Sequence, residues 1–156
     1  MDNNLYFIDH ANRTFSIYVM DLTTKTTKIL LGDGEYNPNK EEAKYLYKNF
    51  IFIEDTMYYY MLSPDGLYVY QNGESKLISD NENIDEYSLF SYDGDLYYII
   101  WAEGTSPWKL MKYNPDTEEV MEVTEIENLS RDPKIIDGCL YYRNKNDNFL
   151  SMELKR

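Results

Sequence analysis

The chain alternates between short runs of apolar and aromatic residues and clusters of Asn, Asp, Gly and Pro. The runs are four to seven residues long and rich in Tyr, Ile, Phe and Val, which is typical of β-strands. Helical spacing is nearly absent, and only the segment 39–48, NKEEAKYLYK, is a candidate for a short helix. The pattern predicts strands at 5–9, 15–21, 26–31, 46–53, 57–62, 67–71, 75–78, 87–91, 96–101, 109–113, 120–124, 134–136, 139–143 and 149–154.

The residues between the runs have the chemistry of tight turns. The pair Asp-Gly at 93–94 and again at 137–138 supplies the positive φ values that a two-residue hairpin needs. Proline in PDG at 64–66 and in NPDTEE at 114–119 has the fixed φ with which many β-turns begin. We therefore expect consecutive strands to pair as antiparallel hairpins.

A short motif, Leu or Met followed by Tyr or Phe residues, recurs along the chain and indicates the length of a repeat. Leu5, Met57, Leu96 and Leu140 each stand directly before a Tyr, at intervals of 52, 39 and 44 residues. A second strand follows each copy, and a third, polar-alternating strand follows three of them. The unit is therefore about forty residues long and holds up to four antiparallel strands, a pattern typical of β-propeller blades.

The third copy of the motif carries a resemblance to a known repeat. YDGDLYYI at 92–99, followed by WKLMKYNPDTEEVMEV at 108–123, resembles the blade consensus of Tyr-rich bacterial β-propeller repeats, in which a DG-LYY hairpin precedes a Leu-x-x-Tyr-Asn-x-x-Thr strand and turn. The segment LYYRNKNDNFLSMEL at 140–154 is similar to it with a shorter connection. The resemblance covers nearly the whole chain. It implies propeller-like blades and a role in binding, and it contains no catalytic residues to carry over.

The repeat predicts an all-β fold of three to four blades in one domain, with units near 4–34, 45–79, 87–125 and 133–155. The first unit lacks its innermost strand, and the last lacks its outermost strand. Because closed propellers have at least four blades, three arrangements remain open: an open stack of blades, a four-bladed miniature, and half of a ring completed by a second chain. The uncovered edges and faces of an open stack favour a partner, either a second copy or another protein.

Composition and terminal sequence indicate the compartment. The chain has 43% hydrophobic residues and 17 tyrosines, which is the composition of a folded domain. Cys139 is the only cysteine, the first ten residues lack the pattern of a secretory signal, and no apolar run is long enough for a membrane span. We therefore expect a cytoplasmic protein.

The net charge of −13 is distributed unevenly. The segment 77–127 contains thirteen acids and only two bases, Lys109 and Lys112, which gives −11. Such a field repels nucleic acid and anionic membranes and attracts basic protein surfaces. An exposed aromatic beside these acids would add a binding hot spot. The expected partner-binding residues are Asp80, Glu82, Asp85, Glu86, Trp101, Glu103, Trp108, Glu118, Glu119 and Glu122.

The sequence offers no recognisable catalytic or metal-binding set. The only histidine, His10, has no nucleophile elbow to accompany it, and Cys139 is expected to be a small core residue. One Cys and one His are too few for a structural zinc site. The acidic stretch 80–86 lacks the Gly and Glu of a calcium loop, and there is no Gly-rich phosphate loop. We expect neither enzymatic activity nor a metal or cofactor.

The leading hypothesis is a non-enzymatic protein-interaction module. In its sharper form the chain is an acidic antagonist, of the immunity or anti-defence type, which covers a basic surface of a protein partner. This rests on class-level analogy. The alternatives are a self-assembling propeller, as a homodimer that serves as a scaffold or as a ligand- or glycan-binding platform, and a hydrolase that uses paired carboxylates.

Overall fold

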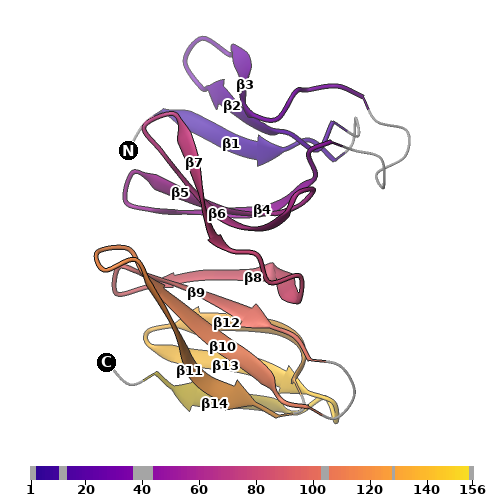
Figure 1. Ribbon diagram of the computed structural model, residues 1–156, viewed down its shortest axis with the longest axis vertical. Helices are drawn as coiled ribbons and strands as arrows, with labels where there is room; N and C mark the ends of the chain where they lie inside the picture. The colour runs from indigo at the N-terminus through magenta and orange to yellow at the C-terminus, as the bar shows by residue number, and fades with distance from the viewer. Residues whose placement is uncertain (1–2, 11–13, 37–43, 103–105, 128, 155–156) are drawn as a thin grey trace.

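The computed structural model describes residues 3–10, 14–36, 44–102, 106–127 and 129–154, and every regular element in these ranges is a β-strand. The strands form four antiparallel sheets in chain order (Figure 1). Sheet 1 contains β1 (Asn4–Ile8), β2 (Ile17–Asp21) and β3 (Thr27–Leu31). Sheet 2 contains β4 (Tyr47–Ile53), β5 (Thr56–Leu62), β6 (Asp65–Gln71) and β7 (Glu74–Ser79).

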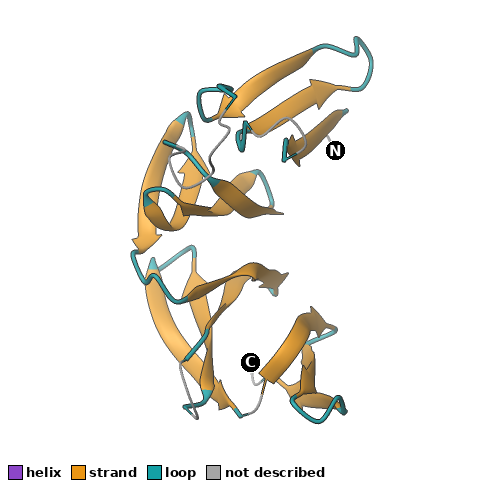
Figure 2. Ribbon diagram, turned by 90° about the vertical axis from the view of Figure 1, so that its right-hand side faces the viewer, coloured by secondary structure: helices purple, strands orange, loops and turns teal. Residues whose placement is uncertain are grey.

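The second half of the chain repeats this arrangement. Sheet 3 contains β8 (Ile84–Tyr92), β9 (Asp95–Ile100), β10 (Trp108–Asn114) and β11 (Glu119–Ile126). Sheet 4 contains β12 (Leu129–Ile136), β13 (Cys139–Asn144) and β14 (Phe149–Glu153). In each sheet the strand order is the chain order, so each sheet is an antiparallel meander. The four sheets follow one another along an arc, with sheets 1 and 4 at its two ends (Figure 2).

The tight turns form where their residues predict them. Asp93 and Gly94 have φ values of 52° and 82° between β8 and β9, and Asp137 and Gly138 have 48° and 76° between β12 and β13. Both φ values are positive, as the two-residue hairpin requires, and Asp tolerates this region better than most residues. A Cβ on Gly138 would stand 2.6 Å from the hydroxyl oxygen of Tyr92, so this turn also allows sheets 3 and 4 to approach closely.

The expected incompleteness of the first and last units is confirmed. Leu5 lies on β1, whereas Met57, Leu96 and Leu140 lie on the second strands of their sheets, β5, β9 and β13. β1 therefore corresponds to a second strand, and sheet 1 has no counterpart of β4, β8 and β12. Sheet 4 ends at β14, its third strand.

The core lies between successive sheets. We call the face of a sheet that points to the preceding sheet its front face and the opposite one its back face. On β5, Tyr59 packs with Ile17 in the core between sheets 1 and 2, while Tyr58 and Tyr60 belong to the core between sheets 2 and 3. Alternate tyrosines thus fill opposite cores, because successive side chains of a strand point to opposite faces. All three are 2% exposed or less.

Two expectations about local structure need correction. The candidate helix at 39–48 is wrong where it can be checked, because Tyr47 and Lys48 belong to β4 and residues 44–46 are not helical; residues 39–43 lie outside the described ranges. β12 begins at Leu129, earlier than the expected 134, because pairing with β13 extends it over the polar sequence at 130–132. No helix long and apolar enough to cross a membrane occurs in the described ranges.

Candidate interaction surface

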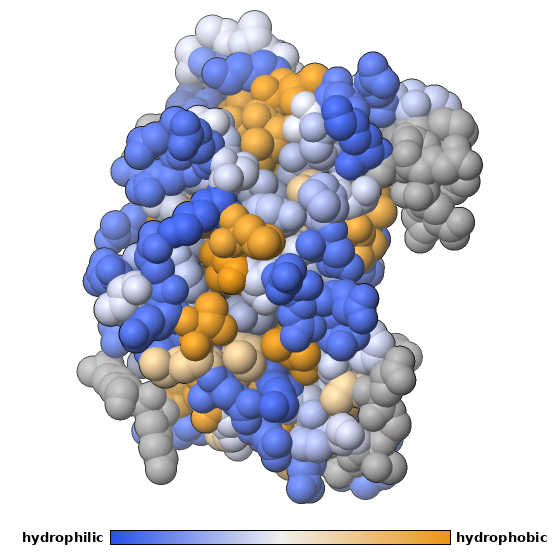
Figure 3. All heavy atoms as spheres, in the orientation of Figure 1, coloured by the Kyte–Doolittle hydropathy of each residue, from blue (hydrophilic) through white to orange (hydrophobic). Residues whose placement is uncertain are grey.

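The hairpin turns within sheets 2 and 3 gather at one end of the molecule, which we call the hairpin end. These are the turns β4–β5, β6–β7, β8–β9 and β10–β11, along the left margin of Figure 1. Glu54, Asn72, Asp93 and Glu118 in these turns all have positive φ, between 52° and 57°. Hydrophilic residues cover the same margin in the space-filling view (Figure 3). The repeat therefore presents one polar turn after another on a single surface.

Two adjoining hollows of about 220 and 450 Å³ lie between sheets 2 and 3 at the hairpin end. Both are bordered by the β4–β5 and β10–β11 turns, and Tyr58 contributes to the wall of each. A single base, Lys76, is among the residues that line them. The carboxylates that line them are Glu54, Glu74, Asp93, Asp95, Asp116 and Glu118.

Two of these carboxylates are neutralised by lysines. Lys76 on β7 forms an ion pair with Glu118, which joins sheets 2 and 3. Asp95 accepts hydrogen bonds from the Lys112 ammonium at 2.9 Å and from the Asn114 side-chain amide at 2.8 Å. The other four have no ion-pair partner among the residues that the structure describes: Glu54, Glu74, Asp93 and Asp116.

Neutral tyrosines stand behind this acidic rim. The ring centroids of Tyr58 and Tyr113 lie 6.1 Å apart across the contact between sheets 2 and 3. Burial, helped by Tyr113 and by the charges of Asp116 and Glu54, raises the pKa of Tyr58 to about 12. Burial and the charge of Glu118 likewise raise the pKa of Tyr113. The wall is therefore uncharged and aromatic, and the rim is anionic.

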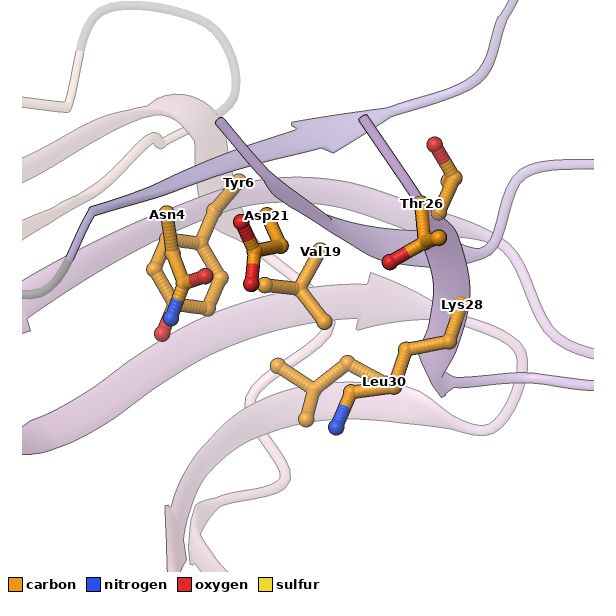
Figure 4. A pocket seen from close by; sticks show the side chains of 8 residues that line it. Asn4, Tyr6, Val19, Asp21, Thr26, Lys28 and Leu30 are labelled. Carbon is orange, nitrogen blue, oxygen red and sulfur yellow. The ribbon is translucent and has the colours of Figure 1, made fainter. Parts of the chain in front are cut away.

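A similar hollow of about 410 Å³ lies on the back face of sheet 1 at the same end (Figure 4). Tyr6 and Lys28 in its lining occupy the positions of Tyr58 and Lys76, as the strand register shows. Asp21 is the only carboxylate among the described residues that line it. The acidic character therefore belongs to the space between sheets 2 and 3, and the repeat alone does not produce it.

The acids expected near residue 80 lie at the opposite end. Asp80 and Glu82 are exposed in the connection from β7 to β8. At the start of β8, Asp85 is partly buried, and this burial raises the pKa of its carboxyl. Glu86 forms an ion pair with Lys48 of β4 at 2.9 Å, so it contributes to the contact between the inner strands of sheets 2 and 3.

The tryptophans belong to the same opposite end of sheet 3. The backbone N–H of Trp101 donates to the carbonyl oxygen of Asn83 at 2.8 Å, and its side chain is half-buried. Trp108, also half-buried, packs against the core between sheets 3 and 4. Glu103, expected beside them, lies outside the described residues.

The ten expected binding residues are therefore not brought together on one surface. Glu118 lines the acidic hollow, Glu119 begins β11 nearby, and Glu122 on the edge strand β11 is paired with Lys109 at 2.8 Å. The residues expected from the sequence do not include Glu54, Glu74, Asp93, Asp95 and Asp116. Their shared signal is position: each lies in or next to the first or third turn of its unit, and antiparallel meanders place those turns at the same end.

The remaining candidates for chemistry lie elsewhere. The His10 ring contacts the ring of Phe15 edge-on at 5.9 Å, and Cys139 is a half-buried free thiol on β13. Within the described ranges, no group of three or more His, Cys, Asp and Glu side chains is placed to hold a metal ion.

Comparisons with known proteins identify the fold. No family model and no curated protein matches the sequence. A chain of the nidogen/laminin complex is similar in structure, with a TM-score of 0.56 and 13% identity over 99% of this chain and 73% of that one. An oligogalacturonate lyase in complex with manganese has a TM-score of 0.54 and 14% identity over 86% of this chain and 41% of its own.

A third structure is the oligogalacturonate lyase of Vibrio parahaemolyticus, with a TM-score of 0.50 and 17% identity over 87% of this chain and 42% of that one. This chain thus spans less than half of either lyase. All three neighbours have β-propeller-type folds, which confirms the all-β, propeller-like architecture. At these identities the likeness concerns the fold alone.

Proposed function

We propose that this chain is a non-enzymatic protein-interaction module that binds a basic surface of a protein partner at the hairpin end of sheets 2 and 3. The observation that carries the proposal is the group of carboxylates around the two hollows that pair with no base in the described part of the chain: Glu54, Glu74, Asp93 and Asp116. Because these carboxylates stand on short turns of adjoining sheets, their backbone is already ordered, and binding a partner's Lys and Arg side chains requires less ordering of this surface.

The size of the larger hollow and its aromatic wall favour a protein side chain over a free cation. A lysine or arginine side chain that enters the larger hollow, of about 450 Å³, places its methylenes against Tyr58 and Tyr113 and its charge at the acidic rim. Clusters of opposite charge increase the association rate and lose their effect in salt. An inhibitor of the antagonist type uses such a surface to cover the basic groove of a nucleic-acid-handling enzyme.

The test compares two variants with equal charge change. The hairpin-end variant contains Glu54→Gln, Glu74→Gln, Asp93→Asn and Asp116→Asn. The matched control neutralises four exposed acids elsewhere: Asp80→Asn, Glu82→Gln, Glu125→Gln and Glu127→Gln. Asn is acceptable at position 93, because Asn adopts positive φ readily.

The probe is a panel of purified basic proteins that includes nucleases, assayed for binding over a series of salt concentrations and for inhibition. We expect wild type and control to bind at least one member with similar affinity, and the hairpin-end variant to bind it at least about tenfold more weakly with a smaller salt dependence. An equal loss of affinity in both variants would mean that the net charge of the protein, and not the position of these acids, determines binding. Unchanged binding by the hairpin-end variant contradicts the proposal.

A further inference from the structure

The two sheets at the ends of the arc each have one face that no other sheet covers. Elsewhere, the front face of a sheet packs on the back face of the preceding sheet, and this contact occurs three times along the chain. Among the described residues, no other sheet packs on the front face of sheet 1 or on the back face of sheet 4, which lie at opposite ends of the arc (Figure 2). Only the margin of the front face of sheet 1 at Ile29 and Tyr18 is approached by the segment at Gly34. The chain therefore has one free face of each kind.

At Leu5, the front face of sheet 1 has the same kind of apolar side chain that the other sheets bury on their front faces. By strand register, Leu5 corresponds to Met57, Leu96 and Leu140 on the front faces of the other sheets. Those three side chains are 1%, 0% and 0% exposed, whereas Leu5 is 48% exposed. The same position is thus buried by a neighbouring sheet three times and left open once.

A stacked aromatic pair repeats the pattern on this face. Phe7 and Tyr18 pair across β1 and β2, with ring centroids 5.5 Å apart and planes at 14°. Tyr59 and Tyr68 occupy the same positions in sheet 2, 5.3 Å apart at 9°. Because Tyr59 is 2% exposed beneath sheet 1, this pair shows what covers such a surface: the back face of another sheet.

The back face of sheet 4 shows the complementary relationship. Phe149 on β14 corresponds by register to Ile17, Leu67 and Leu110, all of which are 0% exposed. Phe149 is 73% exposed, and its ring is covered only in part by the Arg143 guanidinium, 4.4 Å from the ring centroid. A large aromatic side chain thus stands in solvent at a core position of the repeat.

Two more apolar side chains extend this surface. Tyr141 is 43% exposed, although its counterparts Tyr58 and Tyr97 are 2% and 4% exposed. Ile136, on the same face of the neighbouring strand, is 54% exposed. Exposed apolar side chains therefore occur on the back face of all three strands, β12, β13 and β14, with Arg143 and Lys134 at polar positions among them.

The charge distribution permits two such acidic molecules to meet at these faces. Residues 129–154, which include sheet 4, contain four bases and four acids, and residues 3–36, which include sheet 1, contain three bases and four acids. The −11 concentrated in residues 44–126 belongs to sheets 2 and 3. Contact between sheet 1 and sheet 4 therefore joins the two least charged parts of the molecule.

We propose that two copies of this chain associate head to tail, with the front face of sheet 1 of each copy on the back face of sheet 4 of the other. The contact continues the packing already made three times within one chain. It is heterologous, and two identical contacts close it into a ring. The ring contains eight sheets, which is within the usual range of four to eight blades, whereas three copies would exceed it.

The first measurement is the mass of the protein in solution by light scattering across a wide range of concentration. We expect a monomer of 18.6 kDa when dilute and a species of twice that mass when concentrated. A mass that stays at 18.6 kDa at every concentration overturns the proposal, and so does growth beyond the dimer.

Three single variants locate the contact. Leu5→Arg changes the front face of sheet 1, at a position on β1 and not at Ile29 of β3, where Gly34 is in contact. Phe149→Glu changes the back face of sheet 4. Each places an unpaired charge in the contact and should weaken dimerisation by about a hundredfold or more. Met121→Arg is the matched control, because Met121 is 46% exposed on the edge strand β11 of sheet 3 and belongs to neither face. The control should dimerise like wild type.

Mixing the two disrupted variants distinguishes head-to-tail contact from contact between like faces. Leu5→Arg keeps an intact sheet 4 and Phe149→Glu keeps an intact sheet 1, so the mixture restores one unaltered contact and should give dimer. Failure of the mixture to dimerise, while each variant shows the wild-type circular dichroism spectrum, contradicts the proposal. The thiol of Cys139, on the same back face as Tyr141, gives a second readout: its reaction with a thiol reagent should slow as wild type dimerises, but not in either variant.

Discussion

Lys76 on β7 and Glu118 in the β10–β11 turn form an ion pair that joins sheet 2 to sheet 3 beside the acidic hollows. Their side chains are 61% and 59% exposed, so water screens the pair and its contribution to stability is small. Its effect is on the charge of the surface, because no other base lines the hollows among the residues that the structure describes.

Removing that base should strengthen binding at the hairpin end. We expect Lys76→Gln to leave the melting temperature unchanged and to increase affinity for a basic protein, with a steeper loss of affinity in salt. The control is Lys25→Gln, which makes the same charge change in the exposed β2–β3 turn. Equal gains in the two variants, measured by titration calorimetry, would show that the hollow has no special role.

Leu110 and Phe149 occupy equivalent positions in their sheets, yet truncating them should lower the free energy of unfolding by very different amounts. Leu110→Ala removes a side chain that is 0% exposed in the core between sheets 3 and 4, and should destabilise the fold by about 2–5 kcal/mol. Phe149→Ala removes one that is 73% exposed and should cost much less in a dilute, monomeric sample. Urea unfolding of the two variants checks this. Similar costs would mean that the back face of sheet 4 is already covered within one chain.

The buried Tyr58 hydroxyl should make the fold sensitive to alkali. Its pKa is raised to about 12 in the folded protein, against about 10 in an unfolded chain. The stability that it contributes is therefore complete below pH 10 and is lost as the pH rises from about 10 to 12, because the unfolded chain releases this proton first. Thermal melting over this range should fall less steeply for Tyr58→Phe than for wild type. Tyr36→Phe, at a side chain 66% exposed, should follow wild type.

Asp85 should make the stability of the fold depend on pH in the acidic range. Burial raises the pKa of its carboxyl, so the folded state holds the charged form at a cost at neutral pH, despite the opposing hydrogen bonds from Ser88 and the Tyr87 backbone. The contribution of the Asp85 side chain to the stability of the wild-type fold is most favourable below about pH 4, and it is lost as the pH rises through the pKa of Asp85 in the folded state. Asp85→Asn should therefore raise the melting temperature at pH 7 and give no gain in acid. An equal gain at both pH values would assign the effect to something other than this charge.

Local chemistry made most of the fold predictable from the sequence. Asp93–Gly94 and Asp137–Gly138 have few conformations open to them other than the tight hairpin, and the Tyr-rich strands beside them alternate between two cores. β12 was underestimated because the residues at 130–132 have no strand preference of their own. Pairing with β13 determines their conformation, and the neighbouring strand is not visible in a local window.

The acidic hollows could not be predicted by counting charges along the chain. Glu54 and Asp116 are more than sixty residues apart, yet both border the same space between sheets 2 and 3. Asp80 and Glu118 lie in the one acidic segment and are at opposite ends of the sheets. Two acids lie at the same end of the sheets when the turns that carry them both follow odd-numbered strands of their sheets, or both follow even-numbered ones. The density of charge along the sequence does not depend on this.

Strand order in the four sheets also determines how the molecule should respond to force. Every pair of strands in the described ranges joins neighbours in the chain, so no strand ties a distant part of the sequence into a sheet. Pulling on the two ends should peel β1 and β14 away first and then extend the molecule one sheet at a time, as a series of separate steps at modest force. A molecule whose ends are joined to a second copy would instead resist until that contact breaks.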